Sequence, residues 1–148
     1  SGYYQTFEFD NGFGDTDSAD QYGIGAQYRF GAFRVAVNYG IADSDNPLGG
    51  SIEHEGIGVG LGMKVGVGEI LFNYIQQELD TAGDPEGKSW GLAYVHPLSK
   101  RTNLYATYGQ MDNKGGGQFG LNYSQSSVAA GAPNADPQAF AIGVRHLF

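Results

Sequence analysis

Few residues in this sequence could do acid–base or nucleophilic chemistry, and they are scattered. The chain has three histidines, His54, His96 and His146, and no cysteine. A hydrolytic site needs a nucleophile beside a histidine base, with a third group that orients the base. Ser51 lies near His54, but no acidic residue is placed in register to orient that histidine. We therefore predict that the protein is not an enzyme.

Two further stretches resemble ligand-binding loops only in outline. The acidic segment DNGFGDTDSAD at 10–20 lacks the aspartate order and the closing glutamate of a calcium loop. The glycine run GIGVGLG at 56–62 does not match G-x-G-x-x-G. We expect no metal and no cofactor.

Basic residues offer a different chemistry, which acts through charge alone. Rings of basic side chains that line an aqueous passage favour anions. The candidates for such a lining are Arg29, Arg34, Lys64 and Arg145, with Tyr105 as a neutral companion. The alternative is that these cations neutralise nearby carboxylates or lie in bulk water. Which reading holds depends on the elements that carry them.

Composition narrows the class of protein. The 16 acidic and 8 basic residues give a net charge of -8, which disfavours nucleic acid and anionic membrane surfaces as partners. Glycine occurs 25 times and aromatic residues make up 14% of the 148 residues. No run approaches the ~18 apolar residues of a transmembrane helix. We interpret the chain, 1–148, as a single unit built from strands.

Apolar residues alternate with small or polar ones in segment after segment. In QYGIGAQYRF, at 21–30, the residues Tyr22, Ile24 and Tyr28 share one face, while Gly23 and Arg29 lie on the other. A period of two is typical of a strand with two unlike faces. Segments of about nine to eleven residues are the length of a tilted strand that crosses a bilayer.

The same pattern predicts eight strands. The segments are 2–9, 21–30, 33–41, 53–64, 68–77, 89–96, 102–110 and 139–148. In the first, we expect Tyr3 on the apolar face and Tyr4 on the polar one. In 68–77 we expect Phe72 and its alternate neighbours on the apolar face, although Leu71 and Ile75 then lie on the polar one.

Connections between these segments alternate in length. Short turns follow 21–30, 53–64 and 89–96, and the long connections are about 10–20, 42–52, 79–88 and 111–137. Membrane barrels have short periplasmic turns and longer external loops, so both termini are expected on the periplasmic side. Within 111–137, Phe119, Leu121 and Tyr123 alternate, and we expect strands there to extend beyond the membrane.

The predicted fold class is all-β, an antiparallel up-and-down transmembrane β-barrel. Aromatic residues fall into two tiers on the apolar face, as in the interfacial girdles of such barrels. The competing interpretation is a soluble β-sandwich or lipocalin-like barrel whose apolar face points inward. Its solvent face would then be rich in glycine and poor in charge, which is unusual.

Two segments carry a family resemblance. HPLSKRTNLYATYGQ, at 96–110, and AFAIGVRHLF, at 139–148, resemble the closing strands of trimeric general porins of the Gram-negative outer membrane, most closely the β-proteobacterial type. The LSKRT turn and the terminal G-V-R-H-x-F pattern are the most specific features. A weaker likeness extends back to about residue 20.

The resemblance implies a sixteen-stranded, water-filled channel in a homotrimer, through which small hydrophilic solutes or ions diffuse passively. It also implies contacts with outer-membrane lipid, lipopolysaccharide and the barrel assembly machinery, but not with nucleic acid. The terminal residues Phe140, Ile142, Val144 and Phe148 resemble the signal that this machinery recognises. Anchoring of these aromatics at the membrane interface is the simpler reading.

The sequence departs from that family in one respect, because it offers eight strands, corresponding to the later half. Either it is part of a larger barrel, or it closes alone. Eight strands enclose a space that side chains fill, so a closed form would be a sealed barrel with a structural or adhesive role. The glycine-rich inward face favours the wider, water-filled assembly.

Overall fold

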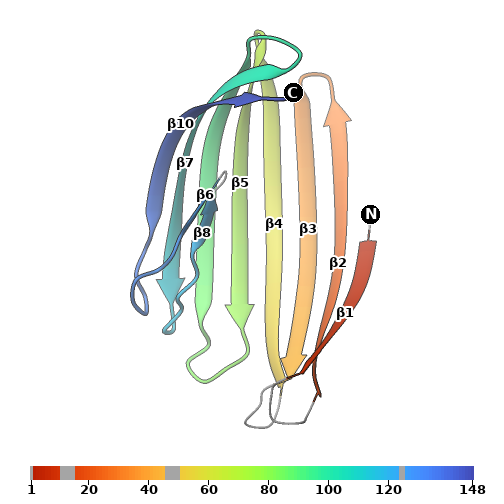
Figure 1. Ribbon diagram of the computed structural model, residues 1–148, viewed down its shortest axis with the longest axis vertical. Coiled ribbons are helices and arrows are strands. Elements are labelled where there is room, and N and C mark those ends of the chain that lie inside the picture. The colour runs from red at the N-terminus through yellow and green to blue at the C-terminus, as the bar shows by residue number, and fades with distance from the viewer. Residues whose placement is uncertain (1, 11–15, 46–50, 124–125) are drawn as a thin grey trace.

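The computed structural model describes residues 2–10, 16–45, 51–123 and 126–148 and forms one large antiparallel sheet (Figure 1). The strands of this sheet are β1 (Gly2–Asp10), β2 (Thr16–Phe30), β3 (Phe33–Asp45), β4 (Ser51–Val65), β5 (Gly68–Leu79), β6 (Glu86–Pro97), β7 (Thr102–Lys114) and β10 (Gln138–His146). A small hairpin, β8 (Leu121–Tyr123) and β9 (Ser126–Val128), lies between β7 and β10 in the sequence.

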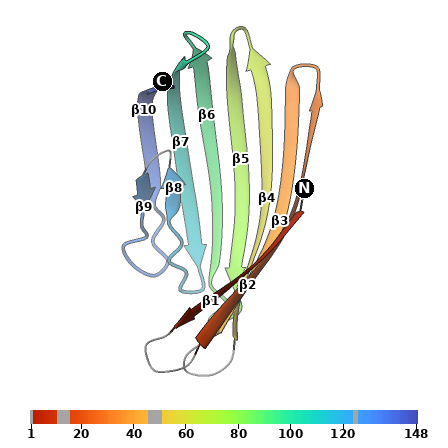
Figure 2. The same cartoon turned by 45° about the vertical axis from the view of Figure 1, so that its right-hand side comes forward.

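The topology is a simple meander. Each strand pairs with its neighbours along the chain, in the order β1-β2-β3-β4-β5-β6-β7-β10. The prediction of eight up-and-down antiparallel strands is confirmed. The sheet is open, because within the described residues β1 and β10 form its two edges and do not pair with each other. Figures 1 and 2 show the strands side by side in a curved wall.

The strands are longer than a bilayer requires. Each of β2 and β4 has 15 residues, and at the usual rise per residue this is about 50 Å, against a hydrocarbon core of about 30 Å before tilt is considered. Pairing therefore continues into segments that the sequence assigns to loops, as where Ala19 lies opposite Ser44. The short turns and the C-terminus lie at one end of the sheet (Figure 1).

Cross-strand register fixes which side chains share a face. Val37 lies opposite Val59, and Val59 lies opposite Tyr74, so the apolar residues of three strands project to the same side. Leu61 is likewise opposite Phe72. The expected orientation of 68–77 is therefore confirmed, and Leu71 and Ile75 do lie on the other face.

The orientation expected for the first segment is wrong. Tyr4 pairs with Tyr22, and the two rings stack with their centroids 5.7 Å apart, so Tyr4 lies on the apolar face. Its hydroxyl donates to the Oδ1 atom of Asp20, 3.2 Å away. Adjacent tyrosines at 3 and 4 made the alternation ambiguous, and the register with β2 decides between them.

The apolar face is exposed and encloses no core. The accessible surface is 9956 Å², whereas a compact monomer of this mass would expose roughly 7,300 Å². Ile24 is 67% exposed and Ile142 is 72% exposed. Among the described residues, the buried apolar side chains are Met111, Leu121 and Ala130. The soluble sandwich with an inward apolar face is therefore wrong.

No helix among the described residues is long and apolar enough to cross a membrane.

Candidate functional site

The face opposite the exposed apolar side chains is called the inner face below. It carries the alternate residues of each strand, including Arg34, Gly62 and Leu71, which are consecutive cross-strand partners. In the strand segments whose side chains are described, this face holds four basic residues and one acidic residue, Glu69. The inner face is therefore cationic in a chain with a net charge of -8.

Three of the basic residues form a cluster near the short turns. Arg29 lies directly opposite Arg34, and Lys64 lies opposite Glu69. The Nη2 atom of Arg34 is 3.1 Å from the Oε1 atom of Glu69, and both side chains are about one-third exposed. Like charges placed opposite each other in a sheet are destabilising unless water screens them. We call Arg29, Arg34 and Lys64 the basic cluster.

The basic cluster keeps an excess of positive charge. The cluster has three cations but a single nearby carboxylate, Glu69, which pairs with Arg34. In the described part of the chain neither Arg29 nor Lys64 forms an ion pair. A surface ion pair of this exposure contributes little to stability. The chemical consequence of the arrangement is a local positive potential over β2, β3 and β4.

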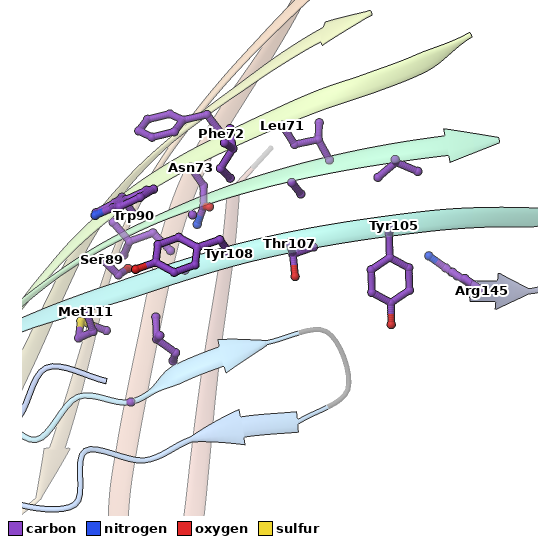
Figure 3. A pocket seen from close by; sticks show the side chains of 18 of the residues that line it. Leu71, Phe72, Asn73, Ser89, Trp90, Tyr105, Thr107, Tyr108, Met111 and Arg145 are labelled. Carbon is purple, nitrogen blue, oxygen red and sulfur yellow. The ribbon is translucent and has the colours of Figure 1, made fainter. Parts of the chain in front are cut away.

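Arg145 is not part of that cluster. It lies on β10 opposite Asn103, and β5, β6 and β7 separate it from Lys64 in the sheet. Tyr105 is its neighbour on the inner face (Figure 3). A Cβ atom built on Gly143 would be 2.5 Å from the Tyr105 ring, so the glycine lets that ring lie close against β10.

Acidic residues of the strands gather elsewhere. Asp43 is opposite Glu53, and Glu78 is opposite both Glu55 and Glu86. These carboxylates share the face of the apolar residues but lie near the long connections, beyond the apolar stretch. The net charge of the chain is therefore the sum of two separate surfaces, a cationic inner face and an acidic region near the long connections.

The glycines of the inner face leave space that the side chains of neighbouring strands occupy. A Cβ atom at Gly62 would be 2.9 Å from the Oε1 atom of Glu69 and 3.1 Å from the Nε atom of Arg34. At Gly58, the side chain of Asn38 occupies the same position. Glycine rows in strands permit such close approach. They keep the polar side chains close to the wall instead of projecting far from it.

The connection between β7 and β10 folds back over the inner face, which the sequence did not predict. Of the alternating residues Phe119, Leu121 and Tyr123, the last two belong to a strand, β8, and Phe119 precedes it. Strands β8 and β9 turn back along the sheet instead of extending away from it (Figures 2 and 3). The ring of Phe119 lies 5.9 Å from that of His54 on β4, centroid to centroid. This segment narrows the space in front of β6 and β7.

One asparagine holds the folded connection in place. The Nδ2 atom of Asn113 donates to the carbonyl oxygens of Phe119, at 3.0 Å, and of Ala135, at 2.6 Å. Its Oδ1 atom accepts from the Phe119 amide at 3.0 Å. Asn113 is 4% exposed, and its buried amide is fully used. Such non-local bonds leave no periodic trace in a sequence.

Aromatic side chains form two groups on the exposed apolar face. Near the short turns, the rings of Phe30 and Phe33 stack at 5.5 Å. Towards the long connections, Trp90 and Tyr108 are 5.3 Å apart, and the Tyr108 hydroxyl donates to the Oε1 atom of Gln138 at 3.0 Å. Rings with an apolar body and a polar tip suit the two membrane interfaces.

The terminal strand places Phe140, Ile142 and Val144 on this exposed face, opposite Tyr108, Ala106 and Leu104. All three are more than 60% exposed, and Phe148 beyond them is fully exposed. The Phe148 ring contacts His146 at 5.0 Å. Their recognition by an assembly machinery stays a prediction.

An open antiparallel meander with an exposed apolar face and two aromatic groups has the architecture of the wall of an outer-membrane β-barrel. Residues 1–116 match the family model described as Gram-negative porin, and the chain belongs to this family. It is thus a protein of the bacterial outer membrane. Family membership also confirms the prediction that it is not an enzyme.

Individual relatives agree with this assignment. Outer membrane porin protein 32 of Delftia acidovorans is 30% identical over 131 residues, which cover 87% of this chain and 37% of that protein. The anion-selective porin from Comamonas acidovorans superimposes with a TM-score of 0.81 at 29% identity, over 90% of this chain and 40% of that one.

A more distant outer-membrane protein shares the fold. OmpT of Vibrio cholerae, described in a trimer form, has a TM-score of 0.71 at 22% identity and covers 88% of this chain and 42% of its own. The chain thus spans about two-fifths of the length of the relatives that it matches.

Proposed function

We propose that this chain forms part of the wall of a water-filled outer-membrane channel through which small hydrophilic anions diffuse passively. The observation that carries the proposal is the inner face, which has four basic residues and one acidic one in the described strand segments, although the chain as a whole is anionic. Basic side chains that line a pore raise the local concentration of anions. Pore width sets the size limit, and the lumen charges set the preference.

The basic cluster itself supports a hydrated interior. Arg29 and Arg34 lie opposite each other with a single carboxylate nearby, and this is tolerable where water screens the repulsion. A sealed eight-stranded barrel would instead fill its interior with bulky side chains. Here the inner face of β4 is a row of glycines between Gly56 and Gly62. The water-filled channel is therefore the better-supported function.

The orientation and assembly are further parts of the proposal. Short turns and the C-terminus lie at one end of the sheet (Figure 1), which we assign to the periplasm, as in other outer-membrane barrels. The connection at 79–88 then lies on the outer side of the membrane, and the connection at 111–137 starts there and folds back over the inner face (Figure 2). We further propose a homotrimer and contacts with lipopolysaccharide and the assembly machinery. One relative is described in a trimer form.

A direct test measures ion selectivity across a planar bilayer with a potassium chloride gradient. The unaltered protein should show a reversal potential that favours chloride. Glu69→Gln removes the acidic partner of Arg34, so we expect the chloride-to-potassium permeability ratio to rise by roughly 1.5-fold to 2-fold. Glu78→Gln, on the opposite face, is the matched control and should leave the ratio unchanged. A cation-selective protein would refute the proposed function.

A further inference from the structure

A hollow of about 610 Å³ lies on the inner face over β5, β6 and β7, and the described residues that line it include none of the basic cluster (Figure 3). Its floor includes small residues on β6 and β7, Ala93 and Gly109, and the side chain of Asn73 lies over Gly91. Ala93 lies opposite Thr107, and Gly91 lies opposite Gly109, so the depression follows two neighbouring cross-strand rows. The volume falls within the range of about 300–1,000 Å³ that is typical of small-molecule sites.

One side of the hollow is apolar, where a hydrated wall would be polar. Leu71 and Ile75 are the residues that break the alternation of β5, and both line this space. Leu121, which is 8% exposed, closes it from the folded connection, with a methyl carbon 3.9 Å from the Cβ position of Gly109. The apolar side thus combines a wall residue with a residue of the folded loop, which Asn113 holds in place.

The other end of the hollow is cationic. Arg145 contributes the one ionisable cation of the lining, and no acidic residue lines the described hollow. The side chain of Tyr105 lies next to it, between Arg145 and the apolar side (Figure 3). An arginine can hold a carboxylate with two parallel hydrogen bonds, which fixes the orientation of the bound acid.

We propose that this hollow is a transient binding subsite for small organic acids with an apolar body, such as aromatic carboxylates. The carboxylate pairs with Arg145, and the apolar body lies on the small-residue floor against Leu71 and Leu121. This inference deepens the proposed function, on which it rests, because it names a preferred solute class. Binding must be weak enough for release, since a tight site would block passage.

Equilibrium dialysis of 3-phenylpropionate against the protein purified from its outer membrane in detergent tests the subsite, with protein-free micelles as the blank. We expect saturable binding and affinity at least threefold above that for propionate. Arg145→Gln should weaken binding about fivefold to tenfold by removing a charge-assisted contact. Leu71→Asn should weaken it about threefold through lost apolar contact. The neutral 3-phenylpropionamide should bind less well than the acid.

Matched controls separate the site from general electrostatics. Arg101→Gln removes the same charge from an exposed turn at the same end of the sheet, and Leu98→Asn removes an exposed leucine from that turn. Both should bind 3-phenylpropionate as the unaltered protein does. Equal losses in Arg145→Gln and Arg101→Gln, or equal affinities for propionate and 3-phenylpropionate, would overturn the subsite.

Chloride conductance of the same preparation in planar bilayers distinguishes the two claims. Conductance without saturable binding overturns the subsite and leaves the channel. Saturable binding without conductance overturns the channel and leaves the subsite as a binding site alone.

Discussion

Replacing Arg29, Arg34 and Lys64 together by glutamine should abolish most of the preference for anions and bring the chloride-to-potassium permeability ratio close to unity. The three cations share one carboxylate, Glu69, so they supply the excess positive charge of their end of the inner face. Once they are removed, Arg145 and Glu69 remain as opposite charges on the inner face of the described strands. The reversal potential in a potassium chloride gradient measures the change.

The control for this triple variant removes equal charge from elsewhere. Lys100, Arg101 and Lys114 are exposed residues of the turns and strand ends, and their replacement by glutamine lowers the net charge by the same amount. If selectivity follows the inner face, this control keeps the anion preference. If both triple variants lose it equally, total charge sets the selectivity and the basic cluster has no special role.

The second large effect concerns the stability of the barrel wall. Val59→Lys puts a charge on the apolar face at the middle of β4, opposite Val37 and Tyr74. A lysine at the membrane midplane costs about 2–4 kcal/mol in a transmembrane barrel. The free energy of folding into lipid vesicles, measured by urea titration, should fall by that amount.

Ala36→Lys is the matched control for Val59→Lys. Ala36 lies at a neighbouring height on β3, opposite Gly60, and projects to the inner face. A lysine there reaches water, and its cost should stay below about 1 kcal/mol. Equal costs for the two lysines would contradict the assignment of one face to lipid and the other to a hydrated interior.

Strand parity could be predicted from the sequence wherever one face is uniformly apolar. Val35, Val37 and Tyr39 alternate without exception, so the face they occupy follows from the period of two alone. The alternation failed at Tyr3 and Tyr4, where two aromatics are adjacent and either could face outward. At these two residues the register with β2 decides which ring lies on the apolar face, and this register cannot be read from the sequence of the segment alone.

The site was harder to predict than the fold, because it depends on relations between distant segments. The four basic residues share the inner face by parity, but only the strand order separates Arg145 from Arg29, Arg34 and Lys64. The folded connection over β6 and β7 depends on hydrogen bonds of Asn113 to residues 6 and 22 positions away. Hydrogen bonds between such distant residues produce no periodic pattern in the sequence. The sequence therefore predicted that strands in this connection would extend outward.

The most direct test of the account is the accessibility of single cysteines along β3 in lipid vesicles, because the chain has no native cysteine. We predict that cysteines at Val35, Val37 and Tyr39 react with a lipid-soluble maleimide and resist a water-soluble one. Cysteines at Ala36 and Asn38 should show the reverse, giving a period of two. The opposite phase, with 36 and 38 in lipid and the valine positions in water, would contradict the account.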